Sequence, residues 1–314
     1  MSAEHLDLSY GDDARALAES VRGFLTRWVD EGGDEPGGVP ARLWKGLAEL
    51  GVLALATPEG GGGVQEIAAV MEVLGEAAAP GPLVAAFMAT QLVDASERER
   101  LASGDRVASV GSPPLLPWAP VAEVFVELAP DGAWLARPAG DVEPVDTLAG
   151  EPWGRVGLER VQPVEEAAWR RAVAVGDTAV AAYLVGAAGH LVAITSQWLR
   201  DRVQFGRPIG EFQSLAHPLA DVEIRTRAAR ALTRMAAYAV DTTPGGGAAP
   251  AATARLSATR AAVDATYRAH QSFGALGFTV EGPVARVGQR VRQVSLHPPG
   301  PAAARQTALA AAQL

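Results

Sequence analysis

The sequence predicts a mainly α-helical fold with a small β domain between two helical regions. Apolar residues recur at helical spacing near both ends of the 314-residue chain. Residues 106–160 instead carry short β-favouring runs between prolines and glycines. With 48% hydrophobic residues, the chain can bury cores of this size. We therefore predict an N-terminal helical domain (1–105), a shortened middle β domain (106–160) and a C-terminal helical bundle (161–314).

The N-terminal domain is expected to contain four helices, separated by glycine and proline, which interrupt helices. The predicted helices cover residues 14–29, 40–50, 64–78 and 82–94. Between the second and third lies Glu59 followed by four glycines. A phosphate loop would need a preceding strand and a following lysine. Because both are lacking, we interpret this stretch as a flexible turn.

The middle domain is predicted from two β-favouring runs, at residues 123–128 and 133–135. Long helical patterns return from Val164, where Leu184, Leu191 and Trp198 are spaced by seven and define an apolar stripe. Further helices are expected at residues 213–240, 251–273, 284–296 and 302–313. Four or five antiparallel helices of this kind predict a bundle.

Composition excludes several classes of function. A net charge of −9 argues against nucleic acid as a partner, because binding to phosphates depends on clustered positive charge. The absence of cysteine excludes disulfides, thiolate metal sites and thiol nucleophiles. Five scattered histidines do not predict a metal site. Residues 1–17 lack the pattern of a signal peptide, and no apolar stretch reaches the roughly 18 residues needed to span a bilayer. We therefore expect a cytoplasmic protein without membrane contact.

One stretch is the most informative in the chain. It reads Arg202-Val-Gln-Phe-Gly-Arg-Pro-Ile209, then Glu211-Phe-Gln213, His217 and Leu219-Ala-Asp221. Read by itself, this is a polar connection between two helices. Taken whole, it resembles the signature of acyl-CoA dehydrogenases. The resemblance continues at residues 43–51, at Pro58-Glu59, at residues 72–75, and at residues 270–278 with Glu281 and Pro283.

The resemblance implies the acyl-CoA dehydrogenase fold, with an N-terminal helical domain, a middle β domain and a C-terminal four-helix bundle. It also implies an oligomer in which the arginine turn of one subunit reaches the FAD of its neighbour. Arg202 would pair with the flavin pyrophosphate, as suits a guanidinium. The implied cofactor-binding residues are Arg202, Gln204, Phe205, Gly206, Gln213, Gln271 and Gly274. Ala275 replaces a second glycine beside Gly274, which weakens that contact.

The family's chemistry needs a carboxylate that removes the α-proton of an acyl thioester while the flavin accepts the β-hydride. The usual position of this base falls here on residues 297–300, and residues 284–314 contain no aspartate or glutamate. Some relatives carry the base on the first long bundle helix, which makes Asp177 the candidate catalytic residue. A solvated or capping role for Asp177 is the alternative. His297 is either a substitute base or a turn residue beside two prolines.

The middle domain also lacks the Thr-Glu-Pro-x-x-Gly-Ser-Asp-like loop that active relatives place against the flavin ring; Ser112 and Trp118 are the nearest substitutes. Three functions therefore remain open. The chain is an active flavoenzyme on an acyl-CoA or acyl-carrier-protein thioester, the non-catalytic half of a heteromer with a related subunit, or a scaffold recruited to non-redox thioester chemistry. The retained and missing parts favour the second slightly. Electrons would leave through an electron-transfer flavoprotein or to oxygen.

Overall fold

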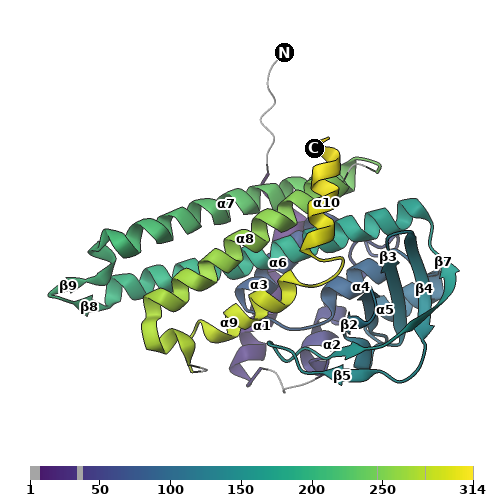
Figure 1. Cartoon of the computed structure of the whole chain (residues 1–314), viewed down its shortest axis with the longest axis horizontal. Coiled ribbons are helices and arrows are strands. Elements are labelled where there is room, and N and C mark those ends of the chain that lie inside the picture. Colours follow the sequence, from purple (N-terminus) through teal and green to yellow (C-terminus); the bar gives the residue numbers. More distant parts are fainter. Residues whose placement is uncertain (1–7, 34–37, 246, 280, 314) are drawn as a thin grey trace, which may run out of the picture.

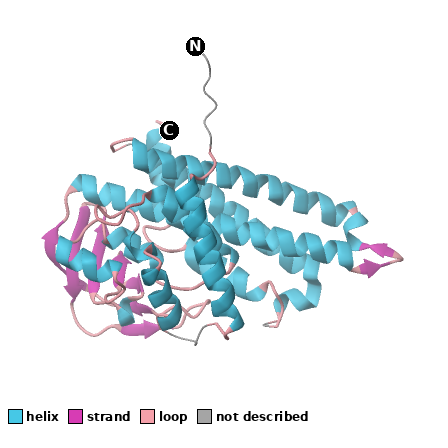
Figure 2. Ribbon diagram, turned by 180° about the vertical axis from the view of Figure 1, so that it is seen from behind, coloured by secondary structure: helices cyan, strands magenta, loops and turns pink. Residues whose placement is uncertain are grey.

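The computed structural model describes residues 8–33, 38–245, 247–279 and 281–313. The predicted fold class, mainly helical with a small β region, is confirmed. Figure 1 shows the strands of the β region gathered at one end of an elongated molecule and the long helices running to the other end, where two short strands lie. Figure 2 shows the same arrangement from behind. The N-terminal helices are α1 (Asp12–Asp30), α2 (Ala41–Glu49), η1 (Val52–Ala54), α3 (Val64–Glu76), α4 (Leu83–Ala89) and α5 (Ala95–Ala102).

The β region consists of two small sheets. One has the strand order β1-β3-β4-β7, formed by β1 (Ala108–Gly111), β3 (Val124–Ala129), β4 (Gly132–Pro138) and β7 (Leu158–Pro163). In this sheet β1 is parallel to β3, and the pairs β3–β4 and β4–β7 are antiparallel. The other is antiparallel with the order β2-β6-β5, formed by β2 (Leu115–Pro117), β6 (Trp153–Arg155) and β5 (Glu143–Val145). Sequence patterns predicted only β3 and β4, because the other strands are short or polar.

The bundle is formed by α6 (Glu166–Asp201), α7 (Gln213–Thr242) and α8 (Ala248–Phe273), followed by η4 (Gly274–Phe278), α9 (Ala285–Ser295) and α10 (Pro301–Ala311). By length and composition alone, α6 could cross a membrane, with an 18-residue window of mean hydropathy 1.6. The expectation that no stretch reaches this length is therefore wrong. Because 78% of that window is buried inside the protein, α6 is the central helix of the core.

Helix α3 ties the N-terminal region to the bundle. Two glycines bring its backbone against α6: a Cβ at Gly75 would lie 1.9 Å from the carbonyl oxygen of Tyr183, and one at Gly186 would lie 2.0 Å from that of Glu72. The first turn of α3 is closed by Asp241 of α7, whose carboxylate accepts hydrogen bonds from the backbone N–H of residues 64 and 65, at 2.9 and 3.1 Å. The two regions thus form one core.

Candidate functional site

The arginine motif forms a short hairpin at the far end of the bundle. Helix α6 ends at Asp201, and β8 (Val203–Gln204) pairs with β9 (Arg207–Pro208) directly after it. The two turn residues, Phe205 and Gly206, both have positive φ, 53° and 80°, as a tight type I′ hairpin turn requires. Figure 1 shows this hairpin projecting beyond the helices that it connects. The sequence predicted a simple turn; the structure has a projecting hairpin.

All seven predicted cofactor-binding residues are exposed on this chain, namely Arg202, Gln204, Phe205, Gly206, Gln213, Gln271 and Gly274. Phe205 is 92% exposed, which is unusual for a large aromatic side chain. The guanidinium of Arg202 lies 5.9 Å from the ring of Trp198 and forms no ion pair among the described residues. The binding roles of these seven residues remain predictions.

A tryptophan connects the hairpin to the second family motif. The ring of Trp198, in the last turn of α6, stacks on Phe273 at 4.9 Å, and its Nε1–H donates to the carbonyl oxygen of Ser272 at 3.0 Å. The end of α8, which carries Gln271 and Gly274, is thereby held against the end of α6. The structure thus brings together at one end of the bundle two motifs that are far apart in sequence.

Asp177 lies in a different environment, the buried junction between the bundle and the β region. Its carboxylate accepts a hydrogen bond at 2.6 Å from Nη1 of Arg255, a fully buried residue of α8. Arg255 also donates to the backbone carbonyl oxygens of Ser295 and His297. Burial raises the pKa of Asp177, and the cation of Arg255 opposes this shift. Catalysis by Asp177 remains a prediction; the geometry gives this carboxylate a structural partner.

A second carboxylate, which the sequence analysis missed, enters the same junction from the middle domain. Glu151 is only 4% exposed and accepts hydrogen bonds from Nη1 of Arg290 at 2.8 Å and from the indole N–H of Trp153 at 3.3 Å. Its other close partner is Nε2 of His297, at 2.8 Å. Burial alone would raise the pKa of Glu151, but His297 and Arg290 outweigh burial and leave that pKa lowered. His297 is therefore a buried partner of a carboxylate, at the turn that follows α9.

We call these five residues, Asp177, Arg255, Glu151, Arg290 and His297, the junction network. Glu151 and His297 are separated by 146 positions in sequence, and Asp177 and Arg255 by 78. No local spacing signals such pairs. The one available hint was that an arginine in an otherwise apolar helix face, such as Arg255, requires a buried acid.

At one point the junction is too narrow for a flavin ring. The resemblance places that ring between the segment after β1 and residues 297–300. Here a Cβ at Gly111, the last residue of β1, would lie 2.8 Å from Cγ of Pro298, so the two segments are in contact. A planar ring needs about 7 Å between its walls, or two van der Waals contacts of about 3.5 Å. The hydroxyl of Ser112 donates to the carbonyl oxygen of Leu128.

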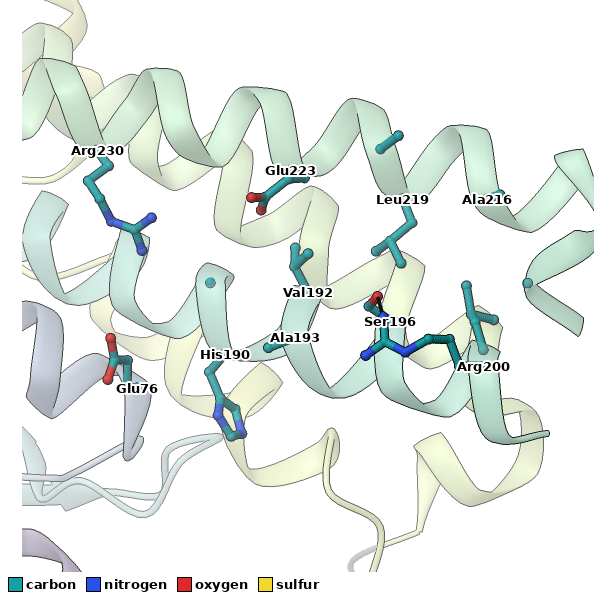
Figure 3. Close-up of a pocket in the computed structure, with 14 residues that line it drawn as sticks. Glu76, His190, Val192, Ala193, Ser196, Arg200, Ala216, Leu219, Glu223 and Arg230 are labelled. Atoms are coloured by element: carbon teal, nitrogen blue, oxygen red, sulfur yellow. Dashed lines mark hydrogen bonds between the residues drawn. The ribbon is translucent and has the colours of Figure 1, made fainter. Parts of the chain in front are cut away.

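A separate groove of about 750 Å³ runs between α6 and α7 and includes residues near the hairpin such as Gly210. Figure 3 shows Arg230 and Glu76 at one end, His190 pointing away from α7, and Arg200 bonded to Ser196 at the other end. Its charged groups are largely paired elsewhere: Glu76 with Arg22, and Arg230 with Glu72. His190 also lines the groove, and burial lowers the pKa of its imidazole. In the described ranges, no group of three or more histidine, aspartate or glutamate residues could hold a metal ion.

Comparison with known families gives two matches. Residues 11–97 match "Acyl-CoA dehydrogenase, N-terminal domain", and residues 167–297 match "Acyl-CoA dehydrogenase, C-terminal domain". The middle domain, residues 106–160, lies entirely between these matches. Among curated proteins, the chain is 34% identical over 259 residues to acyl-CoA dehydrogenase IpdE2 of Mycobacterium tuberculosis, covering 78% of each chain.

Two solved structures have a similar fold. A variant of the steroid ACAD Tcur3481–Tcur3483 superposes with a TM-score of 0.82 at 25% identity, over 97% of this chain and 99% of that one. The ChsE4–ChsE5 complex from Mycobacterium tuberculosis also gives a TM-score of 0.82, at 22% identity, over 98% of this chain and 100% of that one. The first similarity extends through the shortened β region.

Proposed function

Because this chain belongs to the acyl-CoA dehydrogenase family, we propose that it is the non-catalytic chain of a heteromeric, FAD-dependent acyl-CoA dehydrogenase. A related chain would supply the base and the seat of the flavin ring, and this chain would complete the site from across the subunit boundary. The observation that carries the proposal is the contrast between an exposed hairpin and a junction whose two carboxylates are held in buried ion pairs. The complex would act on an acyl thioester in the cytoplasm.

The first part of the proposal is that the hairpin end binds the adenosine diphosphate half of FAD. Arg202 would pair with the pyrophosphate, Phe205 and Gln213 would contact the adenosine, and Gln204, Gly206, Gln271 and Gly274 would line the same half. All seven are exposed, as residues that contact a second chain should be in an isolated one. When bound, FAD supplies the hydride acceptor for forming the α,β-double bond. The chain's own residues only bind and orient it.

The second part of the proposal is that this chain does not supply a catalytic base or a flavin-ring site of its own. Pro298 lies against β1, so the segment expected to face the ring is in contact with the β region. Asp177 and Glu151 are both held in ion pairs, so neither carboxylate is free to act as a base. A base works best with a pKa near the working pH, whereas the pKa of Glu151 is lowered. Two further observations support a partner chain: the similar ChsE4–ChsE5 structure is a complex of two proteins, and the steroid ACAD Tcur3481–Tcur3483 bears two protein names.

The test is to purify the chain alone and together with a related acyl-CoA dehydrogenase chain, and to record visible absorbance and mass. We expect colourless protein alone and a yellow complex with one FAD per pair of chains. Yellow protein in isolation that bleaches with an acyl thioester would contradict the proposal and favour an active flavoenzyme. Colourless protein that turns over a thioester without flavin would favour the recruited scaffold.

A further inference from the structure

One residue, Trp198, joins the two segments that carry the predicted FAD contacts. Its carbonyl oxygen accepts the backbone N–H of Arg202 at 2.9 Å, at the point where α6 passes into the hairpin. Its indole N–H donates to the carbonyl oxygen of Ser272, in the last turn of α8, at 3.0 Å. Gln271 directly precedes Ser272. The main chain and the side chain of the same residue thus hold one predicted FAD contact each.

The end of α8 depends on this tryptophan for its anchor. The buried residues of α8 are mostly alanines, and among residues 270–274 Phe273 is the one buried residue. Phe273 stacks on Trp198, with 4.9 Å between ring centroids and 15° between ring planes, a geometry in which aromatic rings attract each other. The last four carbonyl groups of an α-helix have no α-helical partner, and the indole gives a donor to one of them. Helix ends without such contacts open easily.

We propose that Trp198 is a positioning residue, which fixes the distance between Arg202 and Gln271 so that both contact one FAD molecule at once. This inference rests on the proposed function, which assigns both residues to the same half of the cofactor. Arg202 and Gln271 are themselves exposed, so their side chains do not anchor the segments that carry them. Contacts that are held in place before binding cost less entropy when the ligand arrives. Affinity therefore depends on the residue that holds the contacts as well as on the contacts.

The first test measures the distance between the two segments in the chain without FAD. Because the sequence has no cysteine, Gln204→Cys and Gln271→Cys introduce two unique sites for nitroxide spin labels, and both positions are exposed. By pulsed electron paramagnetic resonance, we expect a narrow distribution of label distances when Trp198 is present. Trp198→Leu should make the distribution about twofold wider, because the end of α8 loses its anchor. Trp198→Phe keeps a ring to stack but loses the N–H, and should give an intermediate width.

The second test measures FAD affinity in the complex with a related chain. Trp198→Leu should weaken FAD binding about tenfold, and Trp198→Phe about threefold. Gln271→Ala should weaken binding about threefold to tenfold when Trp198 is present, and much less together with Trp198→Leu, because the two contacts then no longer act at once. Trp169→Leu is the matched control, since Trp169 is a half-buried tryptophan at the other end of α6. It should leave FAD affinity unchanged.

Three results would overturn the inference. A label distribution as narrow with Trp198→Leu as with Trp198 would show that other contacts hold the two segments. Equal FAD affinities of wild type and Trp198→Leu would show that binding does not depend on the anchor. An equal effect of Gln271→Ala in both backgrounds would show that Trp198 acts through stability alone. The proposed function fails differently: its wild-type complex would bind no FAD, while the label distances would still decide whether Trp198 holds the segments.

Discussion

Charged residues are exposed at one end of the bundle and buried in ion pairs at the other. At the hairpin end, Arg202 and Phe205 lie in solvent, with neither a buried acid nor an apolar core around them. At the junction, Asp177, Glu151 and Arg255 are almost completely buried, and each has an oppositely charged partner. The hairpin matches the family's motif and is exposed, whereas the carboxylates of the junction are held in ion pairs. If the proposed function is correct, one chain has kept a binding motif without an active site of its own.

The strongest test of this contrast is Asp177→Ala. Removing one partner of a buried ion pair leaves Arg255 buried and uncompensated, so we expect a loss of about 3–5 kcal/mol in the free energy of unfolding, measured by urea denaturation. The control is Asp177→Leu combined with Arg255→Met, which removes both charges and should stay within about 1 kcal/mol of wild type. An Asp177→Ala protein that is as stable as wild type but loses turnover would instead identify Asp177 as the base.

The next test concerns pH and Glu151. A carboxylate whose pKa is lower in the folded than in the unfolded state stabilises the fold above its unfolded pKa of about 4.3, and this stability is lost as pH falls toward the lowered pKa. At pH 7, Glu151→Gln should lower the free energy of unfolding by about 2–3 kcal/mol. Below about pH 4, the difference in unfolding free energy between the variant and wild type should become smaller. Urea denaturation of both proteins from pH 3 to 7 isolates the contribution of Glu151 to the pH dependence of stability. Asp177, whose pKa is raised, is present in both proteins and cancels in the comparison. If the difference in unfolding free energy stays the same from pH 3 to 7, Glu151 is not ionised in the folded protein.

At the hairpin end, the effect should fall on FAD binding rather than on folding. In a complex with a related chain, Arg202→Gln should weaken FAD binding about tenfold to a hundredfold, because a charge-assisted contact to phosphate is lost. Its unfolding free energy alone should change by less than about 0.5 kcal/mol, since the side chain is exposed. Arg207→Gln, on the same hairpin, is the control. Equal FAD affinities for the two variants would argue against the assigned contact.

The smallest expected effect comes from Gly206→Ala. Nothing lies within 4 Å of a Cβ placed there, so the cost is the positive φ of 80° alone, about 1 kcal/mol. This strain should loosen the hairpin and weaken FAD binding by about fivefold, with the far-ultraviolet circular dichroism unchanged. If FAD affinity in the complex does not change, the hairpin does not need its observed shape for binding.

Most of the helical architecture could be predicted from the sequence, because its helices are long and periodic. Helix α7 begins at Gln213 as expected, and α8 ends at Phe273 as expected. Prediction failed where elements are short: the region expected to form one helix at 82–94 ends its helix at Ala89, and α5 was missed. Its Asp94 cap, which accepts from the N–H of Glu97, was a readable start signal.

The site could be predicted only where a contiguous motif carried it. The hairpin residues follow one another in the chain, so a resemblance reaches all of them. The junction network is assembled from the middle domain, α6, α8 and α9, and its pairs depend on how those elements pack. Glu151 lies in a loop beside alanine, glycine and proline, and the sequence around it has no periodic pattern that predicts a buried side chain. Long-range ion pairs of this kind need tertiary structure to be seen.

The position of α3 has a consequence for how the chain is made. Ten of its residues, including Ile67, Met71 and Leu74, are buried, and its partners α6 and α7 come much later in the sequence. While the ribosome is still producing the β region, this apolar helix can pack only on earlier elements such as α1, and Asp241 is not yet present to close its first turn. We therefore expect a fragment that ends before α6 to expose the apolar face of α3 and to aggregate.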